Sequence, residues 1–341
     1  MSKLVYIGFS FRHHRNTQAG YHHIKDYLPY DYVFNTDREF DLLFYKQTVW
    51  YKKCLSFFIK HTLGGGCPLT VIKCILLSFI HKNLIFHFIY AEGNYKWLHY
   101  FLGRTNKVVC SFHQPANVLH DAYGWRKDLP YINKVILLSE NDISQFEDWT
   151  HKHNVKFIPH GINTEFYAPA SNVSKVRNIL MVGNWLRDFE FANKVFSEML
   201  NSDELLTVTI VADERNFSFF TPHSRLVLKT CITDQELRLL YQQSYIVFLP
   251  LSSYTANNAI MEAAATGCQI IIATNRADTS YFGVNRIDIL PLDKDKCITY
   301  LFDRLNTVYP QLRVKANRKF VEEQYSWPRI ADETYKYLTN W

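Results

Sequence analysis

The sequence predicts an α/β fold with two doubly wound domains. Short apolar runs rich in β-branched residues alternate with segments of helical pattern along most of the chain. The runs are almost continuously apolar, which is typical of parallel strands that helices cover on both faces. The length of 341 residues fits two domains of ordinary size.

Nine segments have the composition of buried strands. We expect these strands at 3–9, 84–90, 107–113, 134–139, 178–184, 206–212, 225–230, 245–251 and 269–275. We expect helices at 142–151, 189–200, 234–244 and 258–266. The strand–helix–strand pattern appears in both halves of the chain, so each half is expected to form one parallel sheet.

Capping signals support two of these helices. Thr233 and Glu236 have the spacing of a capping box, in which each side chain bonds to the backbone N–H of the other residue. Gly267 stands where a helix commonly ends in a glycine. These signals predict where the helix at 234–244 begins and where the helix at 258–266 ends.

Two segments predict how the chain is divided. The segment 166–178 is small and polar and contains Pro169, as interdomain linkers often do. The last segment, 312–341, has a helical pattern that Pro328 breaks. A helix at the end of the chain could pack back across the first domain.

The protein is mildly basic, and its net charge excludes few classes of function. The net charge is +6, spread along the chain, which suits an anionic ligand, an anionic membrane surface or nucleic acid. No basic stripe or recognition module is visible, so a role in binding nucleic acid is not expected. The seven cysteines are odd in number and form no CxxC pair, which indicates reduced thiols and no zinc site.

The sequence predicts a cytoplasmic protein without a membrane-spanning helix. The first residues, MSKLVYIGFSF, begin with a strand and lack the pattern of a signal peptide. The longest apolar stretch, 67–90, is interrupted by Lys73, His81 and Lys82, and falls short of about 20 apolar residues. Residues 50–89 nevertheless carry lysines among Phe, Leu and Ile. They are expected either to lie on an anionic membrane surface or to form two ordinary helices that cover the first sheet.

The segment TANNAIMEAAATG, 255–267, predicts a ligand site. It follows a strand, and ligands of α/β sheets collect where strands end and helices begin, with phosphate at the helix N-terminus. Asn257 or Asn258 can cap this helix. Glu262 lies one turn further in, where a carboxylate needs hydroxyl or cationic partners, and ribose hydroxyls suit it. The alternative is that Glu262 faces solvent and the asparagines only cap.

The segment MVGNWLRDFEFANKVF, 181–196, predicts a second part of this site. Gly183 ends a strand and lets the backbone approach a ligand closely. Arg187 offers a planar fork of donors for phosphate oxygens. The alternative is a surface ion pair of Arg187 with Asp188 or Glu190.

Several segments together resemble the retaining glycosyltransferases of family 4. The resemblance runs from Val155 to the C-terminus through PHGINTEFYAP, ILMVGNW, TDQELRLLYQQSYIVFLPL, TANNAIMEAAATGCQIIIATN and ANRKFVEEQYSWPRIADETYKYL. It implies the GT-B architecture, in which two Rossmann-like doubly wound domains face each other across a cleft. By this resemblance, residues 1–167 bind the acceptor, 168–322 bind the nucleotide sugar, and a C-terminal helix, 323–341, crosses back to the first domain.

The resemblance also implies which residues bind the donor and act in catalysis. The start of the helix would hold the diphosphate, Glu262 the ribose, and the region of Cys231 and Ile232 the base. The implied donor-binding residues are Gly20, Gly183, Asn184, Cys231, Ile232, Tyr254, Thr255, Asn257, Asn258 and Glu262. The implied catalytic residues are His113, Arg187 and Glu262, and the alternative for His113 is a hydrogen-bonded core histidine.

The chain departs from the family pattern at three positions. Tyr254 stands where the first acid of the Glu-x7-Glu pattern is found. Asn184 replaces the family's arginine and Phe189 its lysine. Arg187 is then expected to supply the cation from a shifted position. Glu92, at another strand end, could face the acceptor.

The resemblance implies transfer of a hexose, with retention, from a nucleoside diphosphate sugar to a hydroxyl of a glycan or lipid-linked acceptor. UDP and GDP are the expected nucleotides, with no cofactor and no metal. The context would be bacterial surface polysaccharide synthesis, at the inner face of the membrane. The alternatives are a non-catalytic nucleotide-sugar-binding subunit that supports a partner transferase, and a sugar-nucleotide epimerase.

Overall fold

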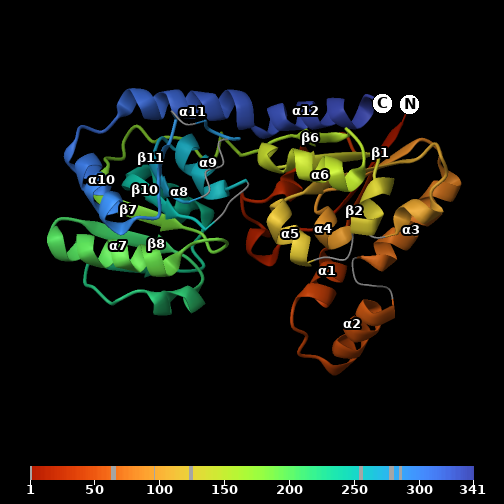
Figure 1. The fold of residues 1–341 in the computed structure, drawn as a ribbon, viewed down its shortest axis with the longest axis horizontal. Helices are drawn as coiled ribbons and strands as arrows, with labels where there is room; N and C mark the ends of the chain where they lie inside the picture. Colours follow the sequence, from red (N-terminus) through yellow and green to blue (C-terminus); the bar gives the residue numbers. More distant parts are fainter. Residues whose placement is uncertain are drawn as a thin grey trace. The chain divides into compact units, whose positions relative to one another are not determined.

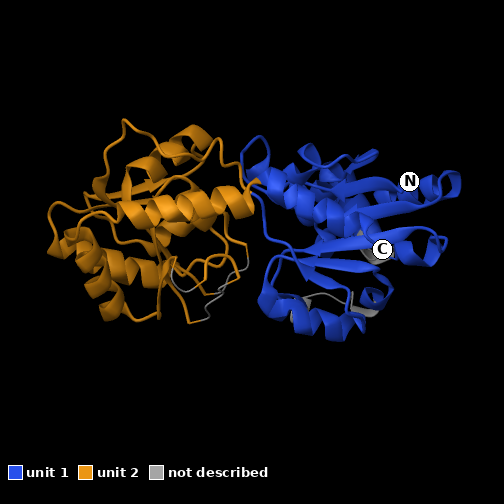
Figure 2. Cartoon of the chain, turned by 90° about the horizontal axis from the view of Figure 1, so that it is seen from above, with its two compact units in different colours: residues 1–161, 327–341 blue, residues 162–326 orange. Residues whose placement is uncertain are grey.

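The computed structural model describes residues 2–62, 67–95, 97–122, 126–252, 256–275, 280–283 and 286–341. The chain folds as two compact units. Unit 1 comprises residues 1–161 and 327–341, and unit 2 comprises residues 162–326 (Figure 2). The chain therefore leaves unit 1 six residues before the expected boundary at 167/168 and returns to it at Trp327.

Unit 1 is built on a parallel six-stranded sheet with the order β2-β1-β3-β4-β5-β6 (Figure 1). Its strands are β1 (Lys3–Gly8), β2 (Tyr32–Asn35), β3 (Leu84–Phe88), β4 (Lys107–Phe112), β5 (Lys134–Leu137) and β6 (Val155–Phe157). The inner strands are buried along nearly their whole length, as continuous apolar runs require. The order reverses between β1 and β3, and ligands bind at such switch points in doubly wound sheets.

Helices surround the sheet of unit 1. They are α1 (Asp37–Phe44), α2 (Trp50–Thr62), α3 (Pro68–Ile80), α4 (Ala91–Asn94), α5 (Ala116–Ala122), α6 (Ile143–Thr150) and α12 (Trp327–Thr339). Short 3-10 turns are η1 (Arg12–His14), η2 (Tyr21–Asp26), η3 (Leu98–Phe101), η4 (Arg126–Tyr131) and η5 (Glu140–Asp142).

The C-terminal helix α12 is part of unit 1. Lys134 donates from Nζ to the carbonyl of Tyr337 at 2.7 Å, and the Tyr337 hydroxyl donates to the carbonyl of Asn154 at 2.6 Å. The indole of Trp327 is buried and lies against Gly161, where the chain leaves the unit. These contacts fix the last helix to the strand ends of the first sheet.

Unit 2 has a parallel six-stranded sheet with the order β12-β11-β10-β7-β8-β9 (Figure 1). Its strands are β7 (Val176–Val182), β8 (Thr207–Val211), β9 (Leu226–Lys229), β10 (Ser244–Pro250), β11 (Gln269–Ala273) and β12 (Asp288–Leu290). Counted from the first strand of the unit, this is the 3-2-1-4-5-6 order of dinucleotide-binding sheets. The switch point lies between β7 and β10.

Helices cover both faces of the second sheet. They are α7 (Phe189–Ser202), α8 (Asp234–Gln243), α9 (Asn258–Ala265), α10 (Lys294–Asn306) and α11 (Gln311–Tyr325), with the turn η6 (Glu214–Phe219). Helix α7 packs against α10, whereas α9 packs against α8 and α11 (Figure 1). The capping box of Thr233 and Glu236 is present, and Gly267 ends α9 with a φ of +75°.

The structure confirms the nine expected strands and the four expected helices. Three further strands, β2, β6 and β12, were not predicted. Each has only three or four residues and lies at a sheet edge, so it lacks the continuous apolar run of a buried strand. The break in the last helical segment lies at Ser326. Pro328 is instead in the first turn of α12, where a proline costs no hydrogen bond.

Gly161 gives a test of how α12 is attached. A methyl group at this position would overlap the buried indole of Trp327. We expect Gly161→Ala to lower the free energy of unfolding of unit 1 by about 1–3 kcal/mol, the usual cost of overpacking. Urea unfolding measures it, with Gly103→Ala as the control, because no atom lies within 4 Å of a methyl group there. Equal stability of the two variants would contradict this packing.

Candidate functional site

The switch point of unit 2 brings together the loops that follow β7 and β10. Arg187 and Leu251 form an isolated antiparallel bridge between these loops. The N–H of Asp188 donates to the carbonyl of Pro250 at 3.1 Å, and the N–H of Ser252 donates to the carbonyl of Leu186 at 3.1 Å. The two loops are therefore held side by side at the strand ends, where the sheet order reverses.

The guanidinium of Arg187 is held by three acceptors. Nε donates to the carbonyl of Val182 at 2.9 Å, Nη1 to the carbonyl of Trp185 at 3.0 Å and Nη2 to Oδ1 of Asn257 at 3.2 Å. Burial lowers the pKa of Arg187 to about 10, so the group remains a cation at neutral pH. In the described part of the chain it forms no ion pair with its neighbours Asp188 and Glu190, so the surface-pair alternative is wrong.

Gly183 makes room for this guanidinium. Its φ is +104°, a conformation that side chains disfavour. A Cβ at this position would lie 2.6 Å from Nη2 of Arg187. The close approach expected at Gly183 is therefore made by the side chain of Arg187, four residues further along the same loop.

Helix α9 begins at the switch point without a side-chain cap. Asn257 occupies the cap position, but its side-chain oxygen accepts from Arg187 instead of from the helix backbone. No described residue accepts a hydrogen bond from the N–H of Asn258 or Ala259. A helix end with free N–H groups and a cation beside it favours an anion. Tyr254 and Thr255 lie outside the described residues.

Glu262 lies one turn inside α9 and is buried, so the solvent-facing alternative is wrong. The hydroxyl of Tyr241 donates to its Oε2 at 2.9 Å. Tyr167 is a second phenol beside this carboxylate, although its hydroxyl has no hydrogen bond of regular geometry to a described residue. Burial raises the pKa of Glu262 to about 7, because the phenols and Arg187 offset only part of the desolvation.

The phenols around Glu262 were not found from the sequence. Tyr241 is buried on the inner side of α8, and Tyr167 is buried in the segment predicted as linker. Arg318 of α11 anchors this region, because its guanidinium donates to the carbonyls of Thr164 and Ala265 at 2.8 Å. The available signal was a tyrosine among the apolar positions of an amphipathic helix, which alone does not identify its partner.

The remaining predicted donor residues of unit 2 lie in the loops that follow β7 and β9. Oδ1 of Asn184 accepts from the N–H of Asp213 at 2.6 Å, which ties the loop after β7 to the start of η6. Cys231 has a φ of +51° in the connection between β9 and α8. Ile232 follows it, partly buried, and no hydrogen bond between described residues joins either to Arg187 or Glu262. Their place near a base stays a prediction.

The two candidate residues of the first half belong to unit 1. Gly20 has a φ of +108°, and a Cβ there would lie 2.7 Å from Nδ1 of His22 and 3.0 Å from Nδ1 of His14. These two nitrogens are buried and have no hydrogen-bond partner among the described residues. The N–H of Tyr21 donates to the hydroxyl of Tyr90 at 3.0 Å, which fixes the turn after Gly20.

His113 follows β4, and its ring contacts those of Tyr21 and Tyr90. Its Nε2 lies 2.6 Å from the carbonyl of Ile89, and since a carbonyl only accepts, Nε2 carries the hydrogen. Burial lowers the pKa of His113 to about 3, so the ring is neutral at pH 7. The backbone N–H of His113 donates to the carboxylate of Glu92. Burial raises the pKa of this carboxyl group to about 7.

Comparison with known proteins identifies the fold. The chain matches no family model, and no curated protein sequence matches it. HepE of Anabaena, solved in complex with UDP and glucose, matches with a TM-score of 0.68 and 11% identity, over 100% of both chains. The chain has the GT-B fold of glycosyltransferases.

Two more glycosyltransferase structures support the same fold. Sucrose-phosphate synthase of Thermosynechococcus elongatus matches with a TM-score of 0.68 and 13% identity, over 98% of both chains. TarM of S. aureus matches with a TM-score of 0.64 and 11% identity, over 79% of this chain and 57% of TarM. The two parallel sheets with helices on both faces are the Rossmann-like units that the sequence predicted.

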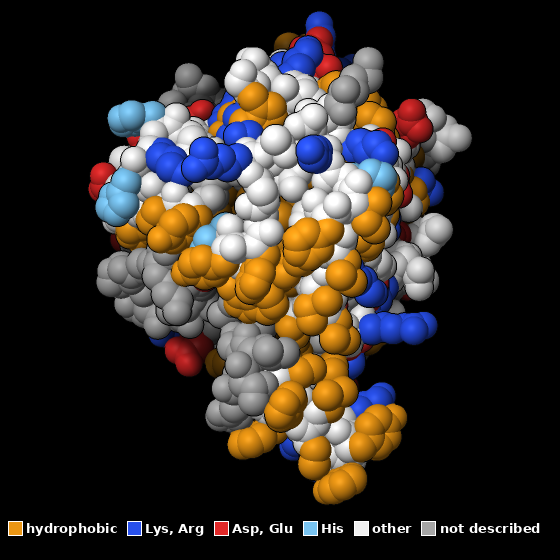
Figure 3. Space-filling view, turned by 90° about the vertical axis from the view of Figure 1, so that its right-hand side faces the viewer, with side chains coloured by type: hydrophobic (Ala, Val, Ile, Leu, Met, Phe, Trp, Pro, Cys, Tyr) orange, Lys and Arg blue, Asp and Glu red, His pale blue; other side chains and the backbone are white. Residues whose placement is uncertain are grey.

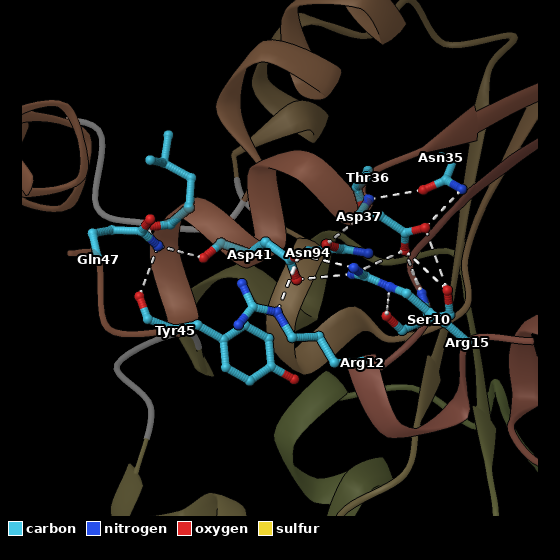
Figure 4. A network of polar contacts seen from close by, with 11 residues as sticks. Ser10, Arg12, Arg15, Asn35, Thr36, Asp37, Asp41, Tyr45, Gln47 and Asn94 are labelled. Atoms are coloured by element: carbon cyan, nitrogen blue, oxygen red, sulfur yellow. Dashed lines mark hydrogen bonds and ion pairs between the residues drawn. The ribbon is translucent and has the colours of Figure 1, made fainter. Parts of the chain in front are cut away.

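A polar network in unit 1 of this GT-B chain fixes the loop that leads to Gly20 (Figure 4). Arg15 makes two hydrogen bonds of 2.8 Å to the carboxylate of Asp41 in α1. Asp37, at the start of α1, accepts from the N–H of Ser10 at 2.6 Å. The segment after β1 is therefore held against α1 at the switch point of the first sheet.

The raised pKa of Glu262 predicts how stability changes with pH. The folded protein holds this proton up to about pH 7, whereas the unfolded chain loses it near pH 4.5, so unfolding becomes easier as pH rises through this window. We expect Glu262→Gln to be as stable as the parent at pH 4 and more stable at pH 8. The difference at pH 8 is on the order of 3 kcal/mol, from about 1.4 kcal/mol per pKa unit.

Urea unfolding at the two pH values measures this difference. Glu323→Gln is the matched control, because Glu323 is exposed on α11. A Glu262→Gln variant that is destabilised more at pH 8 than at pH 4 would show that the carboxylate is charged and well paired in the folded protein.

Gly183 and Arg187 are expected to be coupled. Gly183→Ala has two costs: it strains a backbone with positive φ, and its methyl group overlaps the guanidinium of Arg187. Arg187→Ala removes the overlap but not the backbone strain. We therefore expect Gly183→Ala to cost at least about 1 kcal/mol more with Arg187 present than in its absence. A double-mutant cycle on the free energy of unfolding measures this coupling.

Gly283→Ala is the matched control for this cycle. Gly283 also has a positive φ, +63°, but a Cβ there meets no atom within 4 Å. Its cost should be the same with and without Arg187. If Gly183→Ala lowered the free energy of unfolding equally in both backgrounds, the position of the guanidinium would not depend on the glycine.

Proposed function

We propose that the chain is a retaining, metal-independent hexosyltransferase that uses a nucleoside diphosphate sugar. The observation that carries this proposal is the bond from Arg187 to Asn257 at the uncapped start of α9. It places a fixed cation at the switch point of a doubly wound sheet, beside backbone N–H groups that donate to no described residue. HepE, solved with UDP-glucose, and GtfA, solved with UDP and GlcNAc, share the fold.

The donor would bind along the strand ends of unit 2. Its diphosphate would meet Arg187 and the N–H groups of Asn258 and Ala259, with Gly183, Asn184, Tyr254 and Thr255 around it. Its ribose would bind Glu262, and its base would lie near Cys231 and Ile232. We propose UDP or GDP as the nucleotide. We also propose Gly20 as a residue that binds the donor.

The reaction would proceed on one face of the sugar. The acceptor oxygen forms a bond to the anomeric carbon, and the bond from that carbon to the diphosphate oxygen breaks. The acceptor proton passes to the departing diphosphate oxygen. Arg187 and the start of α9 stabilise the negative charge that grows on the diphosphate, and this stabilisation is the main contribution of the protein.

His113 would contact the transferred sugar as a neutral group. With a pKa of about 3 the ring carries no charge at pH 7, and Nδ1, which bears no hydrogen, would accept a hydrogen bond from a sugar hydroxyl. Because Arg187 and the helix end already supply positive charge at the diphosphate, the proposal assigns no metal. A fixed cation of this kind is a common way to bind phosphate oxygens.

The acceptor would be a hydroxyl of a glycan or of a lipid-linked glycan, bound by the N-terminal unit. The resemblance to family 4 supports this assignment, together with a role in bacterial surface polysaccharide synthesis. TarM was solved with UDP, Fondaparinux and α-GlcNAc-glycerol. A lipid-linked acceptor is confined to a bilayer, so the proposal places the enzyme in the cytoplasm at the inner face of the membrane, with peripheral membrane contact.

A thermal-shift screen against UDP-, GDP-, ADP- and CMP-sugars tests the donor site. One nucleotide class should raise the melting temperature by mass action, and Glu262→Ala should lose that shift. With the matching donor, Arg187→Ala should lower the rate of transfer or donor hydrolysis by at least about 10²-fold, the scale of one lost stabilising donor. Glu323→Ala is the control for both measurements.

The outcomes separate the alternatives. A shift with no transfer or hydrolysis, even with varied acceptors, would favour the non-catalytic donor-binding subunit. The absence of any shift would refute the donor site itself.

A further inference from the structure

One side of unit 1 exposes many large apolar side chains (Figure 3), and α2 and α3, which follow each other along the chain, carry a large share of them. Trp50 is 77% exposed, Phe79 75% and Ile80 75%. We call this surface the α2–α3 face. Its other exposed apolar residues are Val49, Tyr51, Leu55, Phe57, Phe58, Leu69, Ile72 and Leu76. Contiguous apolar exposure of this kind is unusual on a soluble monomer and marks a surface that binds something.

Helix α3 is apolar on two opposite sides. Val71 and Cys74 are fully buried in the core of unit 1. Leu69, Ile72 and Leu76 recur at three- and four-residue spacing on the other side and are exposed. A helix that only covered a sheet would be polar on its outer side. Its exposed residues therefore serve something other than the folding of unit 1.

The position of α3 is fixed although its outer side is apolar. The carboxylate of Glu39 in α1 accepts from the N–H of Leu69 at 2.8 Å and from the N–H of Thr70 at 3.1 Å. These bonds cap the start of the helix from another element. The exposed side is thus presented on an anchored helix.

The segment that forms this surface has basic but no acidic residues. Residues 42–91 contain six lysines and no Asp or Glu. Lys52, Lys53 and Lys73 are exposed, and none of them forms an ion pair within the described part of the chain. Lysines among aromatic and aliphatic side chains are typical of helices that lie on anionic membranes.

We propose that the α2–α3 face docks onto the surface of an anionic bilayer. The apolar side chains would enter the interface between headgroups and acyl chains, and the lysines would meet lipid phosphates. Helix α3 has 13 residues, about 20 Å at 1.5 Å per residue, which is too short to cross a hydrocarbon core of about 30 Å. None of the described helices is long and apolar enough to span a membrane.

A bilayer fits this face better than a second copy of the chain. A symmetric dimer through it would bring the lysines of the two copies together with no acidic residue of α2 or α3 to pair them. An anionic lipid surface supplies the missing negative charge over the whole face. The inference rests on the proposed function for its biological purpose, because a lipid-linked acceptor brings the enzyme to a bilayer.

Vesicle flotation of the full chain tests the proposal. We expect binding to vesicles of phosphatidylglycerol and phosphatidylcholine at low salt, and little binding to phosphatidylcholine alone. Phe79→Ser with Ile80→Ser should lower the partition coefficient at least about tenfold. Lys52→Glu with Lys53→Glu should do the same and remove the salt dependence.

Unit 2 provides the matched controls. Leu312 is 85% exposed on α11, and Val314 on the same turn is buried, so Leu312→Ser should leave vesicle binding unchanged. Lys315→Glu is the corresponding charge control. Unchanged melting temperatures of all variants exclude unfolding as the cause of any loss.

Donor binding in the same variants separates this proposal from the proposed function. Loss of vesicle binding with an unchanged thermal shift by the nucleotide sugar supports docking through the α2–α3 face. Wild-type protein that does not float with anionic vesicles, or a Phe79→Ser/Ile80→Ser variant that floats normally, overturns it. A dimer in sedimentation equilibrium that this variant dissociates, without vesicle binding, assigns the face to a second copy and also overturns it.

Discussion

The hydrogen bond from Arg187 to Asn257 is the interaction on which the donor unit depends. Asn257 stands at the cap position of α9, yet its side-chain oxygen serves the guanidinium. The first N–H groups of the helix consequently donate hydrogen bonds to no described residue. The position of the guanidinium in this bond also requires glycine at position 183, because any larger residue would occupy the same space. A local loss in helix capping therefore creates a fixed positive site where the sheet order reverses.

Burial acts on the two charged groups of this site in opposite ways. It lowers the pKa of Arg187 to about 10 and raises that of Glu262 to about 7. Arg187 is paired with carbonyls and an amide, and Glu262 with a phenol, and no ion pair joins the two in the described residues. No carboxylate among the described residues therefore forms an ion pair with Arg187. The charge of Arg187 remains available to an anion, whereas Glu262 is suited to hydroxyl groups.

The sequence was informative where one local signal decides the structure. Continuous apolar runs predicted nine of the strands, whereas the three-residue β12 at the sheet edge left no such run. The residue types of Arg187 and Glu262 predicted a polar site at the start of α9. Their partners could not be predicted, because the phenol of Tyr241 reaches Glu262 only after α8 packs beside α9. The bond that diverts Asn257 from capping likewise exists only in the folded sheet.

The apolar residues of the two units follow different constraints. On unit 2 the most exposed apolar side chains are Leu205 and, four residues apart, Val308 and Leu312, and so few exposed side chains need no special explanation. On unit 1 they gather on α2 and α3, within a stretch that contains lysines and no acid. Packing cannot account for this pattern, since α3 already contributes a full apolar side to the core. The exposed side is an independent feature of the sequence, and its position on the unit proposed to bind the acceptor suits an acceptor held in a lipid surface.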